Sequence, residues 1–312
     1  MRAGTRTRTR PGRLLRRALK MVVLSSVLGV TLLVVPDASV SPAETALIKI
    51  DRAEGLDLSP DVIWIMAIGS DARPGEDMTH SRGDALQLVG INTQTGAAAA
   101  IGIPRDSYVD IPGHGSNKIN AALTFGGPAA MASSVGNLIG IEPDYVMVTR
   151  FEGLERMVNG IGGITVDNPI SFSDDALKPA GFKAGKIRLK GYDAMAFSRI
   201  RHNLIGGDFD RSANQQRTLM GILRKIRERA DRPGFIQAGV SSVLKGVDTN
   251  ASPGELFQIA QAIAQVDPKK VTHCVLRGGL GSAGGASVVF PDVAMAKGLG
   301  DQARRDASIE HC

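Results

Sequence analysis

The sequence predicts an α/β domain in which a mixed central β-sheet is sandwiched between helices. Short apolar runs of strand length alternate with longer segments of helical periodicity. Two neighbouring runs are joined by a turn signal, which adds an antiparallel pair to the sheet. The 312 residues, 43% of them apolar and 22% charged, are enough for one large domain or two small ones with a sizeable core.

The predicted strands are apolar runs that end at glycine or at polar residues. The run 62–69 (VIWIMAIG) is continuously apolar, which is typical of a buried strand. The runs 84–92 and 97–103 flank TQTG, a pattern that predicts a hairpin. Further strands are expected at 145–150, 163–167 and 269–279. Because helical segments separate most of these runs, we expect helices on both faces of the sheet.

The segments between the strands predict helices. Residues 118–127 and 128–140 form two helices closed by glycines, and 151–163 is a short helix with a glycine stop. The longest pattern is 208–230, where Asp208 is a suitable N-cap and apolar residues recur at helical spacing from Leu219 to Ile226. Other helices are expected at 191–197, 233–246 and 252–266. The glycine-rich stretch 278–289 is expected to be a flexible loop and lacks the residues of a phosphate-binding loop.

The N-terminal residues differ from the rest of the chain. The first twenty contain eight basic residues and no acidic one, and the uncharged apolar segment 21–35 follows them and ends at Pro36. We interpret residues 1–20 as a basic cytoplasmic tail and 21–36 as a signal-anchor or transmembrane segment, by the positive-inside rule. A signal peptide cleaved near 41–43 (SPA), which leaves a secreted protein, is the alternative. Both interpretations place the remainder outside the cytoplasm.

The remainder is expected to comprise a linker (37–60), an extracytoplasmic domain (61–300) and a C-terminal tail (301–312). Without the eight N-terminal basic residues, 29 of the 37 basic residues stand against 31 acidic ones, so its net charge is about −2. A nucleic-acid-binding surface needs an excess of basic residues on the folded domain. The sequence therefore predicts no nucleic-acid partner.

The chain has two cysteines, Cys274 and the last residue, Cys312. In an oxidising compartment such a pair can form a disulfide, which would attach the C-terminal tail to the domain. The alternative is one buried thiol and one thiol at a frayed terminus. The extracytoplasmic prediction favours the disulfide.

Arginines and aspartates gather in segments that follow or precede predicted strands and helices. Such segments meet at the edge where α/β sheets bind ligands. The sequence has no phosphate-binding loop, no H-E-x-x-H zinc motif and no G-x-S-x-G nucleophile turn, and its five histidines are scattered. The candidate residues are Asp71, Arg73, Asp84, Arg105, Asp106, Arg199, Arg201, Asp208, Arg211 and Gln215.

The chemistry of this set suits a diphosphate ligand. Arginine binds phosphate oxygens in pairs and keeps its charge, and two carboxylates are the usual protein contribution to a Mg²⁺ ion shared with phosphates. Phosphoryl transfer needs positioning and charge neutralisation more than a covalent nucleophile. The alternative is that these are surface charges without a function, with Asp208 only a helix cap and Asp84 only a strand-edge charge.

Six motifs in order resemble the LytR-CpsA-Psr family. They are IGSDAR (68–73), SRGDALQLVGIN (81–92), IPRDSYVDIPGHGSNKINAALTFGG (103–127), NLIGIEPDYVMV (137–148), GYDAMAFSRIRHN (191–203) and GGDFDRSANQQR (206–217). The resemblance covers about 61–230 and, more weakly, 247–266. It implies a sheet between helices with an apolar pocket for a polyprenyl chain. It also implies Mg²⁺-dependent transfer of a phosphorylated glycan from a polyprenyl-pyrophosphate carrier to a hydroxyl of peptidoglycan.

The resemblance also implies roles for residues that match the family motifs. Asp71 and Asp84 match its magnesium-associated aspartates, and Arg73 and Arg105 match arginines that line the pyrophosphate site. Arg199 and Arg201 match its R-x-R pair, and Asp208, Arg211 and Gln215 match its D-x-x-R-x-x-x-Q segment. Asp106 and Lys118 are expected to support these residues. The sequence departs from the family at 81–85 (SRGDA), where many members have hydroxyl residues after the arginine and after the aspartate.

Other functions are compatible with the same residues. With water as acceptor, the site would make the protein a polyprenyl-pyrophosphate pyrophosphatase. An envelope protein that binds lipid or wall polymer without catalysis is a second alternative, and a transcriptional regulator is a third. The expected partners are the lipid-linked glycan, peptidoglycan and, through residues 21–36, the membrane.

Overall fold

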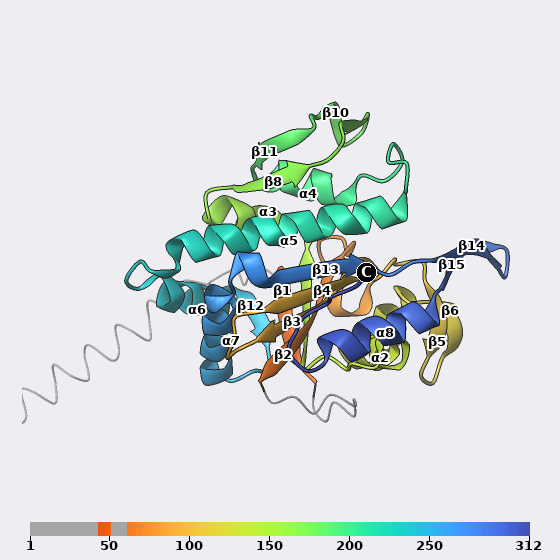
Figure 1. The fold of residues 1–312 in the computed structure, drawn as a ribbon, viewed down its shortest axis with the longest axis horizontal. Helices are drawn as coiled ribbons and strands as arrows, with labels where there is room; N and C mark the ends of the chain where they lie inside the picture. The colour runs from red at the N-terminus through yellow and green to blue at the C-terminus, as the bar shows by residue number, and fades with distance from the viewer. Residues whose placement is uncertain (1–42, 51–60) are drawn as a thin grey trace, which may run out of the picture. The chain divides into compact units, whose positions relative to one another are not determined.

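The computed structural model describes residues 43–50 and 61–312, and these build a mixed seven-stranded sheet with helices on both faces (Figure 1). This confirms the predicted fold class. The strand order is β12-β1-β7-β2-β3-β4-β13. The strands are β1 (Thr45–Lys49), β2 (Val62–Ser70), β3 (Gly83–Asn92), β4 (Ala98–Gly102), β7 (Tyr145–Arg150), β12 (Val247–Thr249) and β13 (Val271–Val275).

The strand directions define two edges of this sheet. β2 pairs in parallel with β7, and β4 pairs in parallel with β13, while β3 runs antiparallel to both β2 and β4. Consequently β2, β4, β7 and β13 all end at one edge, which we call the carboxyl edge, and β3 begins there. The opposite edge, where β2 and β7 begin, is the amino edge.

Alternate residues of the central strands point to opposite faces of the sheet, as strand geometry requires. In β2, Trp64 and Met66 pack in the core beneath helices α2 (Ala121–Ile139) and α8 (Val293–Ala303). Ile65 packs on the other face in a cluster that includes residues of α7 (Pro253–Gln265). Helices α5 (Asp208–Ala230) and α6 (Phe235–Gly246) also contribute to that second cluster. Because both faces are covered, the strands read as nearly continuous apolar runs.

A smaller layer packs on the side of α5 away from the sheet (Figure 1). Its core contains Phe172, Phe182 and Phe197, whose ring centroids lie 5.3–5.4 Å apart, together with Ile222 of α5. Its elements are α3 (Phe151–Gly160), β8 (Ile164–Asn168), β9 (Phe172–Asp174), β10 (Lys178–Phe182), β11 (Gly185–Leu189) and α4 (Gly191–Arg199). Two hairpins, β5 (Tyr108–Ile111) with β6 (Gly115–Lys118) and β14 (Gly278–Ala283) with β15 (Ala286–Pro291), complete the strands.

Three segments differ from the sequence-based expectations. The expected linker 37–60 contains β1, which pairs with β7 and β12 because TALIK supplies a short, largely apolar strand. The expected loop 278–289 belongs to the β14–β15 hairpin, whose turn residues Gly284 and Gly285 have φ values of 56° and 80°. Two-residue hairpin turns of this kind favour glycine. The expected helices 118–127 and 128–140 form one element, α2, which is kinked at Gly126 and Gly127.

The C-terminal residues are part of the domain. The expected tail 301–312 includes the end of α8, and Ala307 and Ile309 are buried in the main core. Cys274 and Cys312 are joined by a disulfide with Cα atoms 5.5 Å apart. The predicted segments 1–20 and 21–36 lie outside the described residues. Among the residues that the structure describes, no helix is both long and apolar enough to cross a membrane.

Candidate active site

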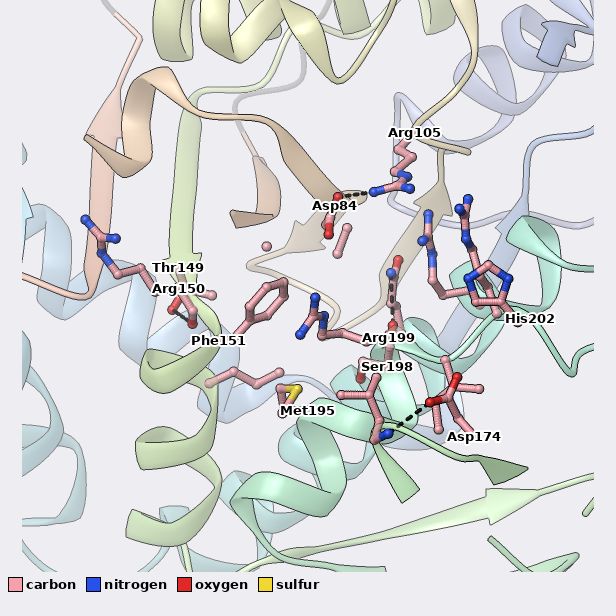
Figure 2. Close-up of a pocket in the computed structure, with 18 residues that line it drawn as sticks. Asp84, Arg105, Thr149, Arg150, Phe151, Asp174, Met195, Ser198, Arg199 and His202 are labelled. Carbon is pink, nitrogen blue, oxygen red and sulfur yellow. Dashed lines mark hydrogen bonds and ion pairs between the residues drawn. The ribbon is translucent and has the colours of Figure 1, made fainter. Parts of the chain in front are cut away.

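A pocket of about 300 Å³ lies at the carboxyl edge, between the sheet and the smaller layer (Figure 2). Its walls come from β3, the segment after β4, the β7–α3 junction, the end of α4 and the start of α5. Six predicted site residues line it: Asp84, Arg105, Arg199, Arg201, Arg211 and Gln215. The structure therefore brings together residues that are separated by up to 131 positions in the sequence.

Asp84 and Arg105 form an ion pair across two neighbouring strands (Figure 2). Asp84 lies at the start of β3 and Arg105 follows the end of β4, and the antiparallel pairing of these strands brings them together. Burial by itself lowers the pKa of the Arg105 guanidinium, but the charges of Asp84 and Asp106 raise it by more, so the net shift is upward. Arg105 is therefore a permanent positive charge, and its side chain is 20% exposed toward the pocket.

Asp71 lies in the segment after β2, close to Asp84. Its backbone N–H donates to the carbonyl oxygen of Arg82 at 3.2 Å, which ties it to the strand that carries Asp84. Burial and the charge of Asp84 raise the pKa of the Asp71 carboxyl. Two carboxylates that repel one another can be stabilised by a cation between them.

This carboxylate pair fits a Mg²⁺ ion. Magnesium is usually held by one or two protein carboxylates, with phosphates and water completing the shell. Within 43–50 and 61–312, no group of three or more histidine, cysteine, aspartate and glutamate side chains could hold a metal by itself. Asp71 and Asp84 would therefore hold the ion together with a phosphorylated ligand.

Arg211 and Gln215 lie one turn apart on α5 and face the sheet. Arg211 is 5% exposed and forms an ion pair with Asp208, and burial lowers the pKa of its guanidinium. The Nε2 of Gln87 donates to Gln215 Oε1 at 3.2 Å, and Gln215 Nε2 donates to the carbonyl oxygen of Ser198 at 3.3 Å. Asp208 is not the N-cap that we expected, because Gly207 occupies that position and Asp208 pairs with Arg211 instead. It does not line the pocket.

Arg199 and Arg201 come from the end of α4 and the segment after it. The guanidinium carbon of Arg199 lies 4.0 Å from the centroid of the Phe151 ring (Figure 2). Such stacking fixes the plane of the guanidinium and leaves its N–H groups directed outward. Arg199 is thus oriented before any ligand binds.

Five predicted residues are not among those that line the pocket: Asp71, Arg73, Asp106, Lys118 and Asp208. Arg73 is exposed, and its backbone rather than its side chain makes the recorded contacts, with Glu76 and Arg150. Lys118 Nζ pairs with Asp106 at 3.0 Å, beside the segment that carries Arg105. Neither residue is among those that line the pocket.

Arg150 is a site residue that the sequence prediction missed. It ends β7, is 7% exposed and donates to the carbonyl oxygens of Ala72 at 3.1 Å, Arg73 at 2.6 Å and Glu76. Figure 2 shows its guanidinium directed away from Arg105 and Arg199. Arg150 therefore holds the loop that follows Asp71, because all three of these hydrogen bonds go to that loop. Its place at the end of the strand YVMVTR was the available signal, since most of the other candidates also lie at strand ends.

The sequence prediction also missed an apolar wall. Phe151, Leu154, Leu177, Met195 and Ile200 line the same pocket as the arginines. They come from the smaller layer, whose assembly around α5 is a long-range feature of the fold. The pocket therefore offers cationic groups on one side and an apolar surface on the other, which suits an amphipathic anion.

The fold and the pocket define an α/β domain with an arginine-rich anion site at the carboxyl edge of a mixed sheet. The chain belongs to the LytR_cpsA_psr family, whose model matches residues 37–303. This agrees with the resemblance of the sequence motifs.

Relatives and solved structures resemble the chain as follows. A polyisoprenyl-teichoic acid–peptidoglycan teichoic acid transferase TagU of Bacillus anthracis is 32% identical over 198 residues, which are 63% of each chain. The chain thus matches just under two thirds of the length of this relative. The crystal structure of B. subtilis TagV is 25% identical with a TM-score of 0.63, covering 79% of this chain and 96% of that one. A LytR-CPS2A-psr family protein, YwtF (TagT), with bound octaprenyl pyrophosphate lipid, is 22% identical with a TM-score of 0.60, covering 84% and 96%.

Proposed function

We propose that this protein is a phosphotransferase that moves a phosphorylated glycan from a polyprenyl-pyrophosphate carrier to peptidoglycan. The observation that carries the proposal is the pocket itself, where five arginines from four separate segments meet two carboxylates, Asp84 and Asp174, and an apolar wall. A diphosphate needs several fixed positive charges, and a polyprenyl chain needs an apolar surface next to them. Both are present within one pocket.

The relatives support this proposal. The B. anthracis relative is named as a teichoic acid transferase to peptidoglycan, and the YwtF (TagT) structure contains octaprenyl pyrophosphate. The present chain shares the fold, and its pocket at the carboxyl edge supplies the cationic and apolar groups that such a ligand needs. The proposed cargo is a wall glycopolymer.

In the proposed reaction, an acceptor hydroxyl of peptidoglycan attacks the phosphorus on the glycan side of the diphosphate. A new bond forms between that oxygen and phosphorus, and the bond from phosphorus to the bridging oxygen breaks. The polyprenyl monophosphate leaves, and an aspartate of the site takes the hydroxyl proton. Arg105, Arg199 and Arg211 neutralise the charge on the phosphate oxygens, with Arg201 beside them. Asp208 keeps Arg211 in position through their ion pair.

The proposal includes a Mg²⁺ ion held by Asp71 and Asp84. When bound, the ion would supply charge stabilisation for the departing phosphate. Burial and the charge of Asp84 raise the pKa of Asp71, and a bound cation would offset the contribution of Asp84.

The proposal also places the domain outside the cytoplasm, tethered by residues 21–36. The substrate carrier is a membrane lipid and the acceptor is the cell wall. An enzyme that acts on both works at the extracytoplasmic face of the membrane. The basic tail before the apolar segment supports this orientation.

Product analysis tests the function. The full chain, in nanodiscs, is incubated with a synthetic polyprenyl-pyrophosphate glycan, peptidoglycan fragments and Mg²⁺, and the products are identified by mass spectrometry. We expect a glycan–peptidoglycan phosphodiester together with polyprenyl monophosphate. Release of the glycan phosphate into water with no linked product would instead establish a pyrophosphatase. Binding of the lipid without turnover would establish a lipid-binding protein.

A further inference from the structure

Four of the exposed large apolar side chains lie in two segments next to the site, 201–209 and 278–293. In the described part of the chain, Ile205 is 99% exposed, Leu280 78% and Val293 53%, the three highest values for large apolar residues, and Phe290 is 46% exposed. Isolated exposed apolar residues are ordinary on protein surfaces, but a group of them marks an interaction surface. We call these four residues the apolar rim.

Leu280 and Phe290 belong to the β14–β15 hairpin, which projects from the domain (Figure 1). The fourteen residues 278–291 contain no charged side chain. Native proteins normally protect exposed strands with charges, and this hairpin has none. A projecting hairpin that has no charge and an exposed leucine is suited to contact with an apolar environment.

The base of the hairpin is attached to the segment that carries Arg105. The backbone N–H of Val289 donates to the carbonyl oxygen of Asp106 at 2.9 Å, and the Phe290 ring lies 5.9 Å from that of Tyr108. Because the hairpin follows β13, it leaves the sheet at the carboxyl edge, where the pocket lies.

Ile205 precedes α5, and the first turn of α5 contacts the base of the hairpin. It lies in the segment between Arg201, which lines the pocket, and Phe209, whose ring is 5.5 Å from the guanidinium carbon of Arg277 at the base of the hairpin. The side chains of the rim therefore come from the two segments that flank the site, and Val293 directly follows the hairpin.

The path of the chain indicates what covers the rim. β1 begins at the carboxyl edge, where Thr45 is paired with Thr149, and the carbonyl oxygen of Glu44 accepts the N–H of Arg150 at 2.9 Å. Six residues separate Ala43 from Pro36, where the predicted membrane segment ends. Seven extended residues span at most roughly 25 Å. The chain therefore enters the domain at the same edge of the sheet as the pocket and the hairpin, close to its predicted membrane attachment.

We propose that the apolar rim contacts the lipid bilayer, so that the carboxyl edge faces the membrane and the pocket receives its substrate directly from the lipid phase. This inference rests on the proposed function for the identity of the substrate, but the contact itself is independent of catalysis. Apolar side chains, not charge, make the contact, because residues 278–291 carry none. Contact should therefore occur with zwitterionic and with anionic lipids.

Tryptophan reporters test the contact. The one native tryptophan, Trp64, is fully buried in the core and gives a constant background. L280W and I205W are made in the full chain, which is reconstituted in phosphatidylcholine vesicles with and without brominated phospholipid. F257W is the matched control, because Phe257 is 38% exposed on α7, away from the carboxyl edge. Positions 280 and 205 are so exposed that the fold tolerates tryptophan there.

We expect a blue shift of L280W and I205W emission in vesicles and strong quenching by brominated lipid, with F257W unchanged. Equal quenching at 257 and 280, or none at 280, would overturn the proposal. A blue shift of L280W in detergent, with no added quenching by brominated lipid, would indicate a protein partner or a second copy and would also overturn it. Because these signals need no turnover, they remain informative even if the transferase function proves wrong.

Discussion

A groove lies at the amino edge of the central sheet and a pocket at its carboxyl edge, and the two differ in size and in the residues that line them. The amino-edge groove is larger, about 590 Å³ against about 300 Å³ for the carboxyl-edge pocket. Among the residues that line it in the described structure there is no arginine, and three glutamines of α7 contribute instead: Gln258, Gln261 and Gln265. The smaller pocket is lined by five arginines. The number of arginine side chains that line the cavity, and not its volume, therefore distinguishes the candidate site from the amino-edge groove.

Charges at the amino edge are arranged for stability. Lys49 Nζ lies 2.6 Å from Glu255 Oε1, and the hydroxyl of Tyr145 donates to the same oxygen at 3.4 Å. Glu255 also forms a capping box with Ser252 at the start of α7. Each charged group here has a partner that belongs to the fold. At the carboxyl edge, Arg199 and Arg201 have no recorded ion pair among the described residues, which is what a ligand site requires.

Removal of a carboxyl-edge arginine should have the largest effect. We expect R199A and R105A to lower the transfer rate by on the order of a hundredfold or more, since each removes a fixed donor to the phosphate charge. Transfer is measured with the lipid-linked donor, and folding by thermal melting. K49M at the amino edge is the control and should keep the wild-type rate. A wild-type transfer rate in both arginine variants would show that the carboxyl-edge arginines are no more important for transfer than Lys49 at the amino edge.

Removal of divalent cations should have the next largest effect. Chelation is expected to slow transfer by about tenfold or more, because a bound cation stabilises phosphate charge by several kcal/mol. D84N should raise the Mg²⁺ concentration needed for half-maximal rate, whereas E255Q at the amino edge should leave it unchanged. Turnover that is insensitive to chelation would show that Asp71 and Asp84 serve another purpose.

Substitution of Arg150 should affect both stability and transfer. R150M leaves three backbone carbonyl oxygens without their donor, at a cost of about 1–3 kcal/mol for a buried group. Denaturant unfolding measures this loss, and the Mg²⁺ dependence of transfer reports the position of Asp71. If R150M lowered diphosphate affinity but not stability, Arg150 would be a ligand-binding arginine and not a support for the Asp71 loop.

Loss of the Phe151 ring should have a moderate effect. F151A removes the stacking that orients Arg199, an interaction of roughly 0.5–2 kcal/mol, so the affinity for the donor should fall by a factor of about 2–30. F151Y keeps the ring and is the control. Equal affinities for F151A and F151Y would mean that Arg199 does not need this contact.

The smallest effect on transfer is expected at Glu255. Hydrogen bonds from Lys49 and Ser252 lower the pKa of Glu255 to about 2. Its folded pKa is below its unfolded value, so its stabilisation is present at neutral pH and disappears as the pH falls toward 2. E255Q should therefore unfold at lower denaturant than wild type at pH 7, and the difference should shrink in acid. A changed transfer rate in E255Q would contradict the assignment of stability to the amino edge and of catalysis to the carboxyl edge.

The fold was largely predictable because its core strands are continuous apolar runs and its long helix has clear periodicity. The errors have identifiable causes. β1 is five residues long and gains its stability from partners far away in sequence, β7 and β12. The glycines of 278–289 suggested a loop, whereas Gly284 and Gly285 form the tight turn that a hairpin requires.

The charged half of the candidate site was predictable and the apolar half was not. Asp84 and Arg105 follow from motifs at strand ends, but Leu154, Leu177 and Met195 belong to segments that pack around α5 and have no local signature. Arg150 was missed because its motif resembles an ordinary strand end. Asp208 was expected to cap α5, but the ion pair with Arg211 is the interaction that the structure records.

A crystal structure of the protein with a polyprenyl diphosphate would test the central claim most directly. We expect the diphosphate between Arg105, Arg199 and Arg211, with the first isoprene units against Phe151 and Met195. Density for the diphosphate in the amino-edge groove beside Tyr145, with the arginine pocket empty, would contradict the assignment of the active site.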